Sequence, residues 1–316
     1  MSRIVVLGAG AIGGVVAAQL HRAGVDVEVI ARGAHLEAIR RDGLVRDAVD
    51  GRHVARVAAH ATVAEAKVGP HDVVLIATKS HQVDPLLDDL LVQAGPEVVV
   101  ACATNGVWTE RLALRRFGHV LGVLVNVPAV HLAPGVVEVY ASAPRGVLDV
   151  GRTTPGPDAA ARDLSAALRE AEFLSEATPR VMDRKWAKLL GNVGNVCSVL
   201  FGPERDRWDD VYRRLRAEAE EVVAAAGITP DVAVQQDRAG RVARGDIDGR
   251  RRPGGSSWQS ATRGTGNIET VALNGEISLL GRLHGVPTPL NTAVTVAALR
   301  LVRDGTPVGS LDPTAF

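Results

Sequence analysis

The stretch RIVVLGAGAIGG, from Arg3 to Gly14, decides the fold because it joins a run of aliphatic residues to four closely spaced glycines. A glycine early in a helix costs about 0.5–1 kcal/mol relative to alanine, so these glycines need a geometric reason. Gly8, Gly10 and Gly13 fit the spacing G-x-G-x-x-G between an expected strand and an expected helix. There Gly8 permits a tight turn, Gly10 lets backbone approach a pyrophosphate, and Gly13 lets the helix pack against the strand.

The sequence therefore predicts a dinucleotide-binding turn, with Ala11 and Ile12 also beside the cofactor because their N–H groups open the helix. The alternative is a plain strand-to-helix turn whose glycines match the spacing by chance. The context between strand and helix favours the cofactor.

The end of the second expected strand, VEVIARG (Val27–Gly33), indicates which dinucleotide binds. NAD-binding chains place an acid there for the ribose 2′-hydroxyl, whereas this chain has Ala31 and Arg32. A guanidinium suits a 2′-phosphate, so the sequence favours NADP(H). The alternative is that Arg32 only caps a surface strand.

The chain up to residue 178 alternates short runs rich in valine and isoleucine with longer amphipathic segments, which is typical of a mostly parallel α/β sheet. The expected strands are Arg3–Leu7, Asp26–Ile30, Asp72–Ala77, Glu97–Ala101, Val120–Val127 and Val147–Val150, and the expected helices are Ile12–Ala23, Val83–Leu91 and Asp158–Ala171.

Residues 179–316 have helical periodicity instead, which predicts an all-α second domain after an α/β domain at 1–178. Its expected helices are Val181–Leu200, Asp206–Ala226, Pro230–Ala243, Asn267–His284 and Asn291–Asp304. The polar stretch Gly245–Gly255, with three arginines at Arg250–Arg252, is interpreted as a solvated loop without a binding role.

Composition excludes several classes of partner. Lysine and arginine number 36 and aspartate and glutamate number 36, so no basic excess favours nucleic acid or an anionic membrane. No apolar run reaches the roughly 20 residues that span a bilayer. Cys102 and Cys197 are far apart, which predicts neither a disulfide framework nor a metal site and fits the reducing cytoplasm.

Polar residues close two further expected strands. Lys79 ends VVLIATKSHQV (Val73–Val83), and Asn105 ends VVVACATNGV (Val98–Val107). Ligands of open α/β sheets lie beyond the carboxyl ends of the strands, so both are candidates for contact with cofactor or substrate. Each is equally well explained as a turn residue.

The second half carries a polar stripe in DRKWAKLLGNVGNV (Asp183–Val196). Lys188, Asn192 and Asn195 are spaced i, i+4 and i+7, beside an apolar stripe. A lysine is charged at neutral pH, with a pKa of about 10.4, and can protonate an oxygen that is becoming an alkoxide. The alternative is a solvent-facing side of the helix.

Taken in order and spacing, these segments make the chain similar to the ketopantoate reductase (2-dehydropantoate 2-reductase) family. The resemblance covers nearly the whole chain and rests on GAGAIG, VIAR, ATKSHQV, TNG, KWAKLLGNVGN and SSWQSATRGTGNIETVALNGEI. It implies NADPH-dependent reduction of a 2-keto acid to a 2-hydroxy acid in pantothenate biosynthesis. It also implies a Rossmann domain, a helical domain and an active site in the cleft between them.

The resemblance also implies roles for individual residues. Lys188 matches the family's general acid, and Glu269 matches the acid that pairs with the lysine or the substrate and also borders the cofactor. Asn192 matches a partner of the substrate hydroxyl and Ser257 a partner of its carboxylate. The cofactor-side positions are Gly8, Gly10, Gly13, Arg32, Lys79 and Asn105, of which Asn105 also lies near the substrate.

The chain departs from the family pattern at several positions. Val196 replaces an asparagine one turn beyond Asn192, although Asn195, about 20° from Lys188 around a regular helix, offers a substitute. Gly254 replaces another asparagine. Ser257 and Glu269 would lie about 18 Å apart on one straight helix, so either this helix breaks or Ser257 precedes it.

These departures leave alternatives open: a reductase of a different 2-keto acid, or a non-catalytic regulatory protein that binds NADP. Polar residues missing from a pocket change which substrate it accepts. A homodimer through the C-terminal helices is a further expectation.

Overall fold

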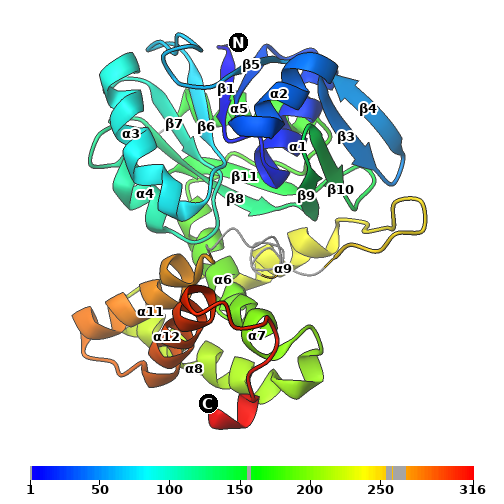
Figure 1. Cartoon of the computed structure of the whole chain (residues 1–316). Helices are drawn as coiled ribbons and strands as arrows, with labels where there is room; N and C mark the ends of the chain where they lie inside the picture. Colours follow the sequence, from blue (N-terminus) through cyan, green and yellow to red (C-terminus); the bar gives the residue numbers. More distant parts are fainter. Residues whose placement is uncertain (1, 155–157, 254–257, 259–267) are drawn as a thin grey trace. The chain divides into compact units, whose positions relative to one another are not determined.

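The computed structural model describes residues 2–154, 158–253, 258 and 268–316 (Figure 1). The chain divides into two compact units. The first comprises Met1–Asn105, Thr109–Met182 and Ala233–Arg252, and the second comprises Gly106–Trp108, Asp183–Val232 and Pro253–Phe316.

The first unit is built on a seven-stranded sheet within the described residues. Its strands, in spatial order, are β11 (Val147–Arg152), β8 (Val120–Asn126), β7 (Val99–Cys102), β6 (Val73–Ile76), β1 (Ile4–Leu7), β2 (Val27–Ile30) and β5 (Ala58–His60). All neighbours are parallel except β11, which pairs antiparallel with β8. This order is the 3-2-1-4-5-6 arrangement of the Rossmann fold with one edge strand added, so the predicted fold class is confirmed.

Helices follow strands of the main sheet along the chain (Figure 1). They are α1 (Ala11–Arg22), α2 (Gly33–Asp42), α3 (Ser80–Ala94), α4 (Trp108–Ala113) and α5 (Ala159–Glu170). The sequence predicted α1, α3 and α5 to within a few residues. It missed α2, which buries only Leu36, Ala38 and Ile39, and α4, which is six residues long.

A four-stranded sheet that the sequence did not predict covers α1. Its order is β4 (Gly51–Ala55), β3 (Leu44–Ala48), β10 (Val136–Val139) and β9 (Ala129–Ala133), with β10 parallel to β3 and the other pairs antiparallel. Helix α1 contacts β1 and β2 on one side and β3, β9 and β10 on the other. The helix therefore lies between the two sheets, which explains why all of its residues from Gly13 to Leu20 are buried.

An ion-pair network ties α1 and the small sheet to the end of the main sheet. Arg145 is fully buried and donates to Asp50 in the β3–β4 turn (Nη1–Oδ1, 2.7 Å) and to Glu172 (Nη2–Oε2, 2.7 Å). Gln19 of α1 also donates to Glu172 at 3.0 Å. A buried guanidinium without its carboxylates would be strongly destabilising, so these contacts fix the three elements together.

A segment of the helical half belongs to the first unit. Arg238 on α9 (Val232–Gly240) forms an ion pair with Asp149 of β11, whose carboxylate is fully buried. This pair explains why Ala233–Arg252 groups with the Rossmann unit although its sequence neighbours on both sides belong to the other.

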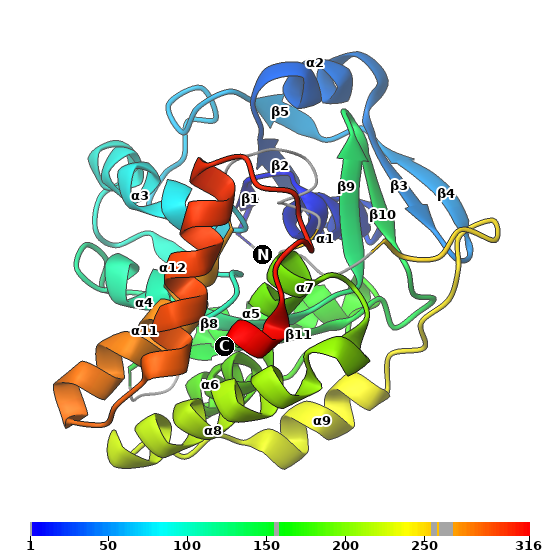
Figure 2. The same ribbon diagram turned by 60° about the horizontal axis from the view of Figure 1, so that its bottom comes forward.

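The second unit consists of packed helices, which confirms the predicted class of the C-terminal half. They are α6 (Val181–Asn192), which begins in the first unit, α7 (Asn195–Phe201), α8 (Asp209–Ala225), α11 (Thr270–His284) and α12 (Pro289–Arg303), with short 3₁₀ turns at Arg205–Arg207 and Pro313–Ala315. Helices α11 and α12 lie side by side and both contact α8 (Figure 2). The apolar stripe of Leu189, Val193, Val196 and Leu200 is buried, as its spacing predicted.

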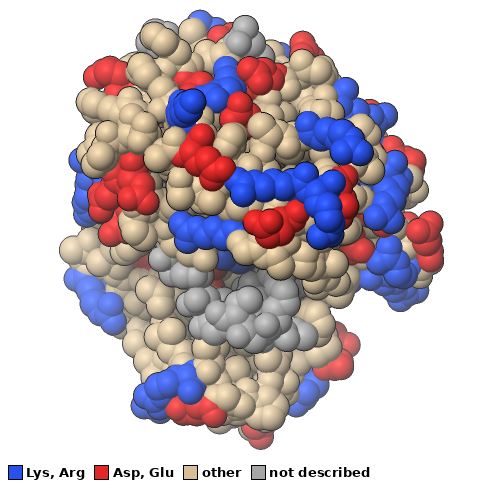
Figure 3. All heavy atoms as spheres, turned by 45° about the horizontal axis from the view of Figure 1, so that its top comes forward, with Lys and Arg blue, Asp and Glu red and all other residues tan. Residues whose placement is uncertain are grey.

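The charges on the face seen in Figure 3 are interspersed, with basic and acidic side chains next to one another. Ion pairs of the first unit follow the same pattern, such as Arg3 with Asp72 at 2.6 Å and Arg116 with Asp88 at 2.6 Å. Balanced charge in the sequence is thus also balanced locally on this face.

Candidate active site

The glycine turn has the geometry that its spacing predicts. Gly8 has φ +99°, and its N–H donates to the Ile30 carbonyl at 3.0 Å. A Cβ atom on Gly8 would lie 2.6 Å from the Thr78 side chain, and one on Gly13 would lie 2.1 Å from the Gly8 carbonyl oxygen. A Cβ atom on Gly10 would meet nothing within 4 Å. Two glycines are therefore required by packing, whereas the third leaves open space beside the backbone.

The start of α1 is suited to an anion. Gly10 is the N-cap residue, no side chain caps the helix, and no acidic residue lies in its first turn. The N–H groups of Ala11, Ile12 and Gly13 have no helical partner by the geometry of a helix end, and they carry the positive end of the helix dipole. The open space at Gly10 together with these donors fits a pyrophosphate.

Gly14, which the motif leaves unassigned, serves the second sheet. A Cβ atom there would lie 2.6 Å from Val137 on β10 and 2.7 Å from the Ala9 carbonyl oxygen. Gly13 therefore lets α1 approach β1, and Gly14 lets the same helix approach the small sheet. Three of the four glycines are therefore explained by close packing, and Gly10 is the one with open space at its Cβ position.

Arg32 follows β2 at the expected place. Ala31 is buried and its N–H donates to the His60 carbonyl at 3.0 Å, whereas Arg32 is exposed and is the N-cap residue of α2. No acid occupies the position of the NAD-type ribose partner.

Lys79 and Asn105 leave the sheet at the same edge as Gly8. Leu7 pairs with Ile76, and Ile76 pairs with Cys102, so the carboxyl ends of β1, β6 and β7 lie side by side. Both side chains are half-buried, and Lys79 is the N-cap residue of α3. The topology thus brings together the cofactor-side candidates of three neighbouring strands, as ligand sites of this fold require.

Thr78 is a candidate that sequence reasoning missed. Its hydroxyl oxygen is buried and has no hydrogen-bond partner among the residues described, and its methyl group contacts the Gly8 position. Buried hydroxyls in proteins are normally paired, so this one makes Thr78 a candidate for contact with a ligand. Its place directly before Lys79 in ATKS is the signal that could have found it.

Lys188 and Asn192 lie one turn apart on α6, and both are half-buried. The amide nitrogen of Asn192 is buried and lacks a hydrogen-bond partner within the described residues. An unsatisfied buried donor costs about 1–3 kcal/mol, which a ligand oxygen would relieve. The helix therefore presents a cation and a vacant donor at successive positions of one face.

The predicted continuous helix from Val181 to Leu200 is wrong, because it breaks after Asn192 and α7 begins at Asn195. The carbonyl of Val193 accepts a hydrogen bond from Asn274 on α11 at 2.9 Å, and the N–H of Cys197 donates to Gly194 at 3.1 Å instead. Gly194 packs so closely on Tyr212 that a Cβ atom would lie 2.3 Å from its ring.

Tertiary contacts thus override the helical pattern at this point. The regular spacing that placed Asn195 on the face of Lys188 does not extend across the break. Asn195 remains half-buried at the first position of α7.

Glu269 is buried and is the N-cap residue of α11, where its carbonyl accepts from Ala272 at 3.0 Å and Leu273 at 3.1 Å. Gly106, which follows Asn105 in the chain, lies against the same helix, since a Cβ atom there would be 2.9 Å from the Ala272 carbonyl oxygen. Gly254, Ser257 and residues 259–267, which lie between Ser257 and Glu269, are outside the described residues.

The stretch around Arg250–Arg252 is exposed over most of its described residues, as its polarity predicts, but it is anchored at two points. Arg250 pairs with Glu138 of β10 at 2.7 Å, and Ile247 is buried beside Val130 and Tyr140. Asp248 and Gly249 both have positive φ and form the turn of a small hairpin closed between Ile247 and Arg250. The sequence did not predict this anchoring, because the partner of Arg250 lies more than 100 positions away in the chain.

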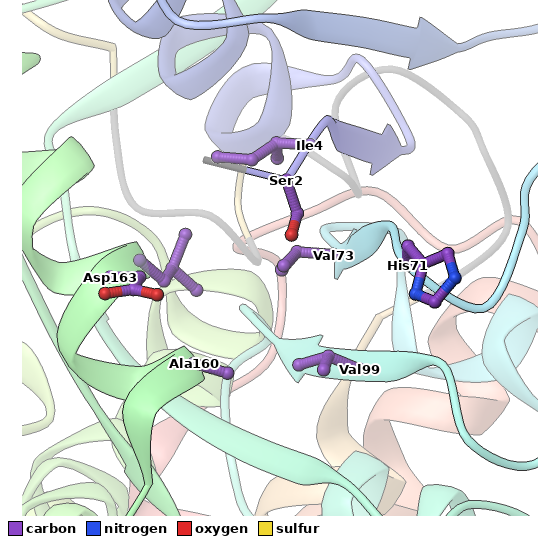
Figure 4. A pocket seen from close by; sticks show the side chains of 8 residues that line it. Ser2, Ile4, His71, Val73, Val99, Ala160 and Asp163 are labelled. Atoms are coloured by element: carbon purple, nitrogen blue, oxygen red, sulfur yellow. The ribbon is translucent and has the colours of Figure 1, made fainter.

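A cavity of about 130 Å³ lies at the opposite edge of the main sheet (Figure 4). Ile4, Val73 and Val99, at the amino ends of β1, β6 and β7, line it together with Asp163 of α5. None of the predicted site residues lines this cavity, and ligands of this fold bind at the carboxyl ends, so it is not the candidate site.

The described residues contain no group of three or more histidine, cysteine, aspartate or glutamate side chains arranged to hold a metal ion. Across that same part of the chain, no helix is both long and apolar enough to span a membrane.

Comparison with known proteins identifies the family. The family model described as "Ketopantoate reductase PanE/ApbA" matches residues 4–153, and the one described as "Ketopantoate reductase PanE/ApbA C terminal" matches residues 180–301. The chain belongs to the ketopantoate reductase family. The resemblance stated from the sequence is thereby confirmed.

Relatives within the family cover almost the whole chain. A 2-dehydropantoate 2-reductase of Mycobacterium tuberculosis is 30% identical over 317 residues, which cover 96% of this chain and 98% of the relative. One of Mesorhizobium japonicum is 29% identical over 334 residues, covering 95% of this chain and 97% of the relative.

Solved structures agree with the fold. A PanE/ApbA family ketopantoate reductase from Ralstonia eutropha JMP134 has a TM-score of 0.78 at 25% identity, covering 96% of this chain and 99% of that structure. The structure of D-mandelate dehydrogenase with NADH and anilino(oxo)acetate has a TM-score of 0.79 at 21% identity, covering 96% of this chain and 98% of that structure. At this identity the similarity supports the fold alone.

Membership in the ketopantoate reductase family makes the protein a NAD(P)H-dependent oxidoreductase acting on CH–OH groups, which reduces a 2-keto acid to a 2-hydroxy acid. The predicted enzyme class is confirmed.

Proposed function

We propose that this protein reduces ketopantoate to pantoate with NADPH, and that Lys188 is the general acid. The observation that carries the catalytic part is on α6, where the buried, unsatisfied amide nitrogen of Asn192 lies one turn from Lys188. A positive charge and a vacant donor on one helix face suit an oxygen that gains negative charge during reduction.

The cofactor is proposed from the residues at the carboxyl edge of the main sheet. NADPH, when bound, supplies a hydride to the keto carbon. The N–H groups at the start of α1 would hold the pyrophosphate, with Gly8 and Gly13 shaping the turn and Gly10 leaving room for it. Arg32 would bind the 2′-phosphate through its exposed guanidinium, and this residue supports NADPH over NADH.

The proton and the substrate are assigned to the helical unit. Lys188, as an ammonium group, would transfer a proton to the carbonyl oxygen as charge develops there. Asn192 would donate a hydrogen bond to a substrate oxygen, and Glu269, buried at the start of α11, would orient the lysine or the substrate.

The remaining candidates are divided between cofactor and substrate. We propose Lys79 and Asn105 on the cofactor side, with Asn105 also near the substrate. Asn195 and Ser257 are proposed as further substrate partners.

A second candidate function is reduction of a different 2-keto acid. It is favoured by Val196, which is buried in the apolar stripe where the family has an asparagine. A site with one donor fewer recognises a hydroxylated substrate less well.

One experiment separates these functions. NADPH consumption is followed at 340 nm with ketopantoate and then with a panel of 2-keto acids, while calorimetry measures NADPH binding. Turnover with ketopantoate supports the first proposal, and turnover only with another acid supports the second. Binding without any turnover would mean a regulatory NADP-binding protein.

We further propose that two copies associate through α11 and α12. Leu283, Val296 and Leu299 are large apolar side chains that remain 67%, 41% and 46% exposed on these helices. Light scattering tests the dimer, and Leu299→Glu is expected to give a monomer if the proposal holds.

A cytoplasmic location is proposed from the cysteines. Cys102 and Cys197 are both buried, and burial raises the pKa of the Cys197 thiol to about 12. A thiol of this kind is unreactive and needs no disulfide partner. Cell fractionation tests the location directly.

A further inference from the structure

His35, three residues after Arg32, joins three parts of the first unit. Its Nε2 lies 2.7 Å from the carbonyl oxygen of Ala9, inside the glycine turn. Its Nδ1 lies 2.8 Å from the backbone nitrogen of Gly135, in the turn between β9 and β10. The imidazole therefore connects the first turn of α2 to the cofactor-side loop and to the small sheet.

The two contacts fix the protonation of the ring. A backbone N–H can only donate, so Nδ1 must accept from Gly135 and carry no proton. In a neutral imidazole Nε2 then carries the proton and donates it to the Ala9 carbonyl. Burial lowers the pKa of His35, which agrees with a neutral ring.

The orientation of the ring is also fixed. His131 on β9 packs against it, with ring centroids 4.2 Å apart and planes at 46°. Gly135 is held in its turn by a second bond, since its carbonyl accepts from Val45 at 2.9 Å. Its φ of +75° favours glycine, and a Cβ atom there would lie 2.8 Å from the Ala38 side chain, so the turn passes close to α2.

We propose that His35 is a positioning residue for the cofactor: it holds the Ala9–Gly10 peptide in the orientation that presents the Gly10 N–H to the pyrophosphate. In a trans peptide the carbonyl and the following N–H point in opposite directions. A carbonyl of Ala9 held by His35 therefore directs the N–H of Gly10 away from the imidazole. The space at the Gly10 Cβ position is open.

Without the hydrogen bond from His35 to Ala9, the glycine turn would have to be ordered by the ligand. A peptide flanked by glycines has many accessible orientations, and fixing them at the moment of binding weakens affinity. His35 pre-organises the loop without touching the reacting atoms. The inference rests on the proposed use of a dinucleotide at this turn.

Two substitutions separate the two hydrogen bonds. His35→Gln keeps a donor near the Nε2 position for Ala9 and loses the acceptor for Gly135. His35→Asn keeps an acceptor near the Nδ1 position for Gly135 and loses the donor for Ala9. Glu37→Gln, an exposed residue on the same helix, is the control.

We expect His35→Asn to raise the Kd for NADPH about tenfold by calorimetry, the effect of one lost ordering hydrogen bond. His35→Gln is expected to stay within about threefold of the wild type, and kcat at saturating NADPH should change little in either variant. Hydrogen exchange is expected to show the Gly135 amide exposed in His35→Gln and protected in His35→Asn. Thermal melting checks that both variants fold.

Equal Kd values for the two variants, or losses of affinity that follow melting temperature rather than the Ala9 contact, would overturn the role of His35. If wild-type protein itself fails to bind NADPH, the proposed function fails instead. The two failures are therefore distinguishable.

Discussion

A Cβ atom on Gly13 would lie 2.1 Å from the carbonyl oxygen of Gly8, so the backbone at Gly8 excludes a side chain at Gly13. This contact is between backbone and backbone, and no rotamer change can relieve it. The close approach of α1 to β1 thus requires glycine at position 13.

Gly13→Ala is therefore expected to destabilise the fold by about 1–3 kcal/mol or more, the cost of overpacking a core. Urea unfolding of the variant and the wild type measures the difference. Gly10→Ala is the matched control, because its Cβ atom meets nothing within 4 Å and its φ of −68° suits alanine. It should unfold like the wild type while binding NADPH more weakly, and equal destabilisation by both alanines would contradict this account.

Arg32→Ala is expected to weaken NADPH binding far more than NADH binding. The lost contact is a charge-assisted bond to the 2′-phosphate, worth about 1.5–3 kcal/mol, or roughly 10- to 150-fold in Kd. Calorimetry with both cofactors measures the ratio. Arg41→Ala, on the exposed last turn of the same helix, controls for a general loss of positive charge. Equal weakening of NADH and NADPH would remove the basis for NADPH preference.

The positions of many candidate residues could be predicted from the sequence, because they depend on local patterns of strands and helices. The turn at Gly8, the arginine after β2 and the residues at the ends of β6 and β7 follow directly from strand and helix periodicity. The small sheet was not predictable in this way, because β10 pairs with β3 from about 90 positions away. Long-range pairing of short strands leaves little trace in the local pattern.

The helix break after Asn192 was hidden for the same reason. Val193 and Gly194 continue the apolar spacing of a helix, whereas the bond from Asn274 and the close packing of Tyr212 lie where the helix ends. His35 also gave no sequence signal, since its partners are backbone atoms of Ala9 and Gly135.

Lys188→Ala is expected to lower kcat by about 10²–10⁴, the range for a lost general acid, with the Kd for NADPH little changed. Asn192→Ala should chiefly raise KM for the keto acid. It removes the hydrogen bond proposed to the substrate oxygen but leaves Lys188 to supply the proton. Single-turnover NADPH oxidation and cofactor titration measure these effects. Asn195→Ala shows whether α7 contributes a donor across the helix break. Near-normal kcat in Lys188→Ala would refute the assignment.

Acid should destabilise the protein through Asp50. Hydrogen bonds from Arg145 hold the pKa of its carboxyl at about 2, against the ordinary value of 3.8. The folded protein binds this proton more weakly than the unfolded chain, so the stabilisation is complete above about pH 4 and is lost as the pH falls toward 2.

Urea unfolding of wild type and Asp50→Asn at a series of pH values tests the effect of acid. The variant should be less stable at pH 6, and the two curves should converge as the pH approaches 2. Asp42→Asn is the control, because Asp42 pairs with Arg41 in full contact with solvent, where an ion pair contributes little. A stability gap between Asp50→Asn and wild type that stays constant from pH 6 to pH 2 would show that Asp50 stabilises the fold by its packing and not by its charge.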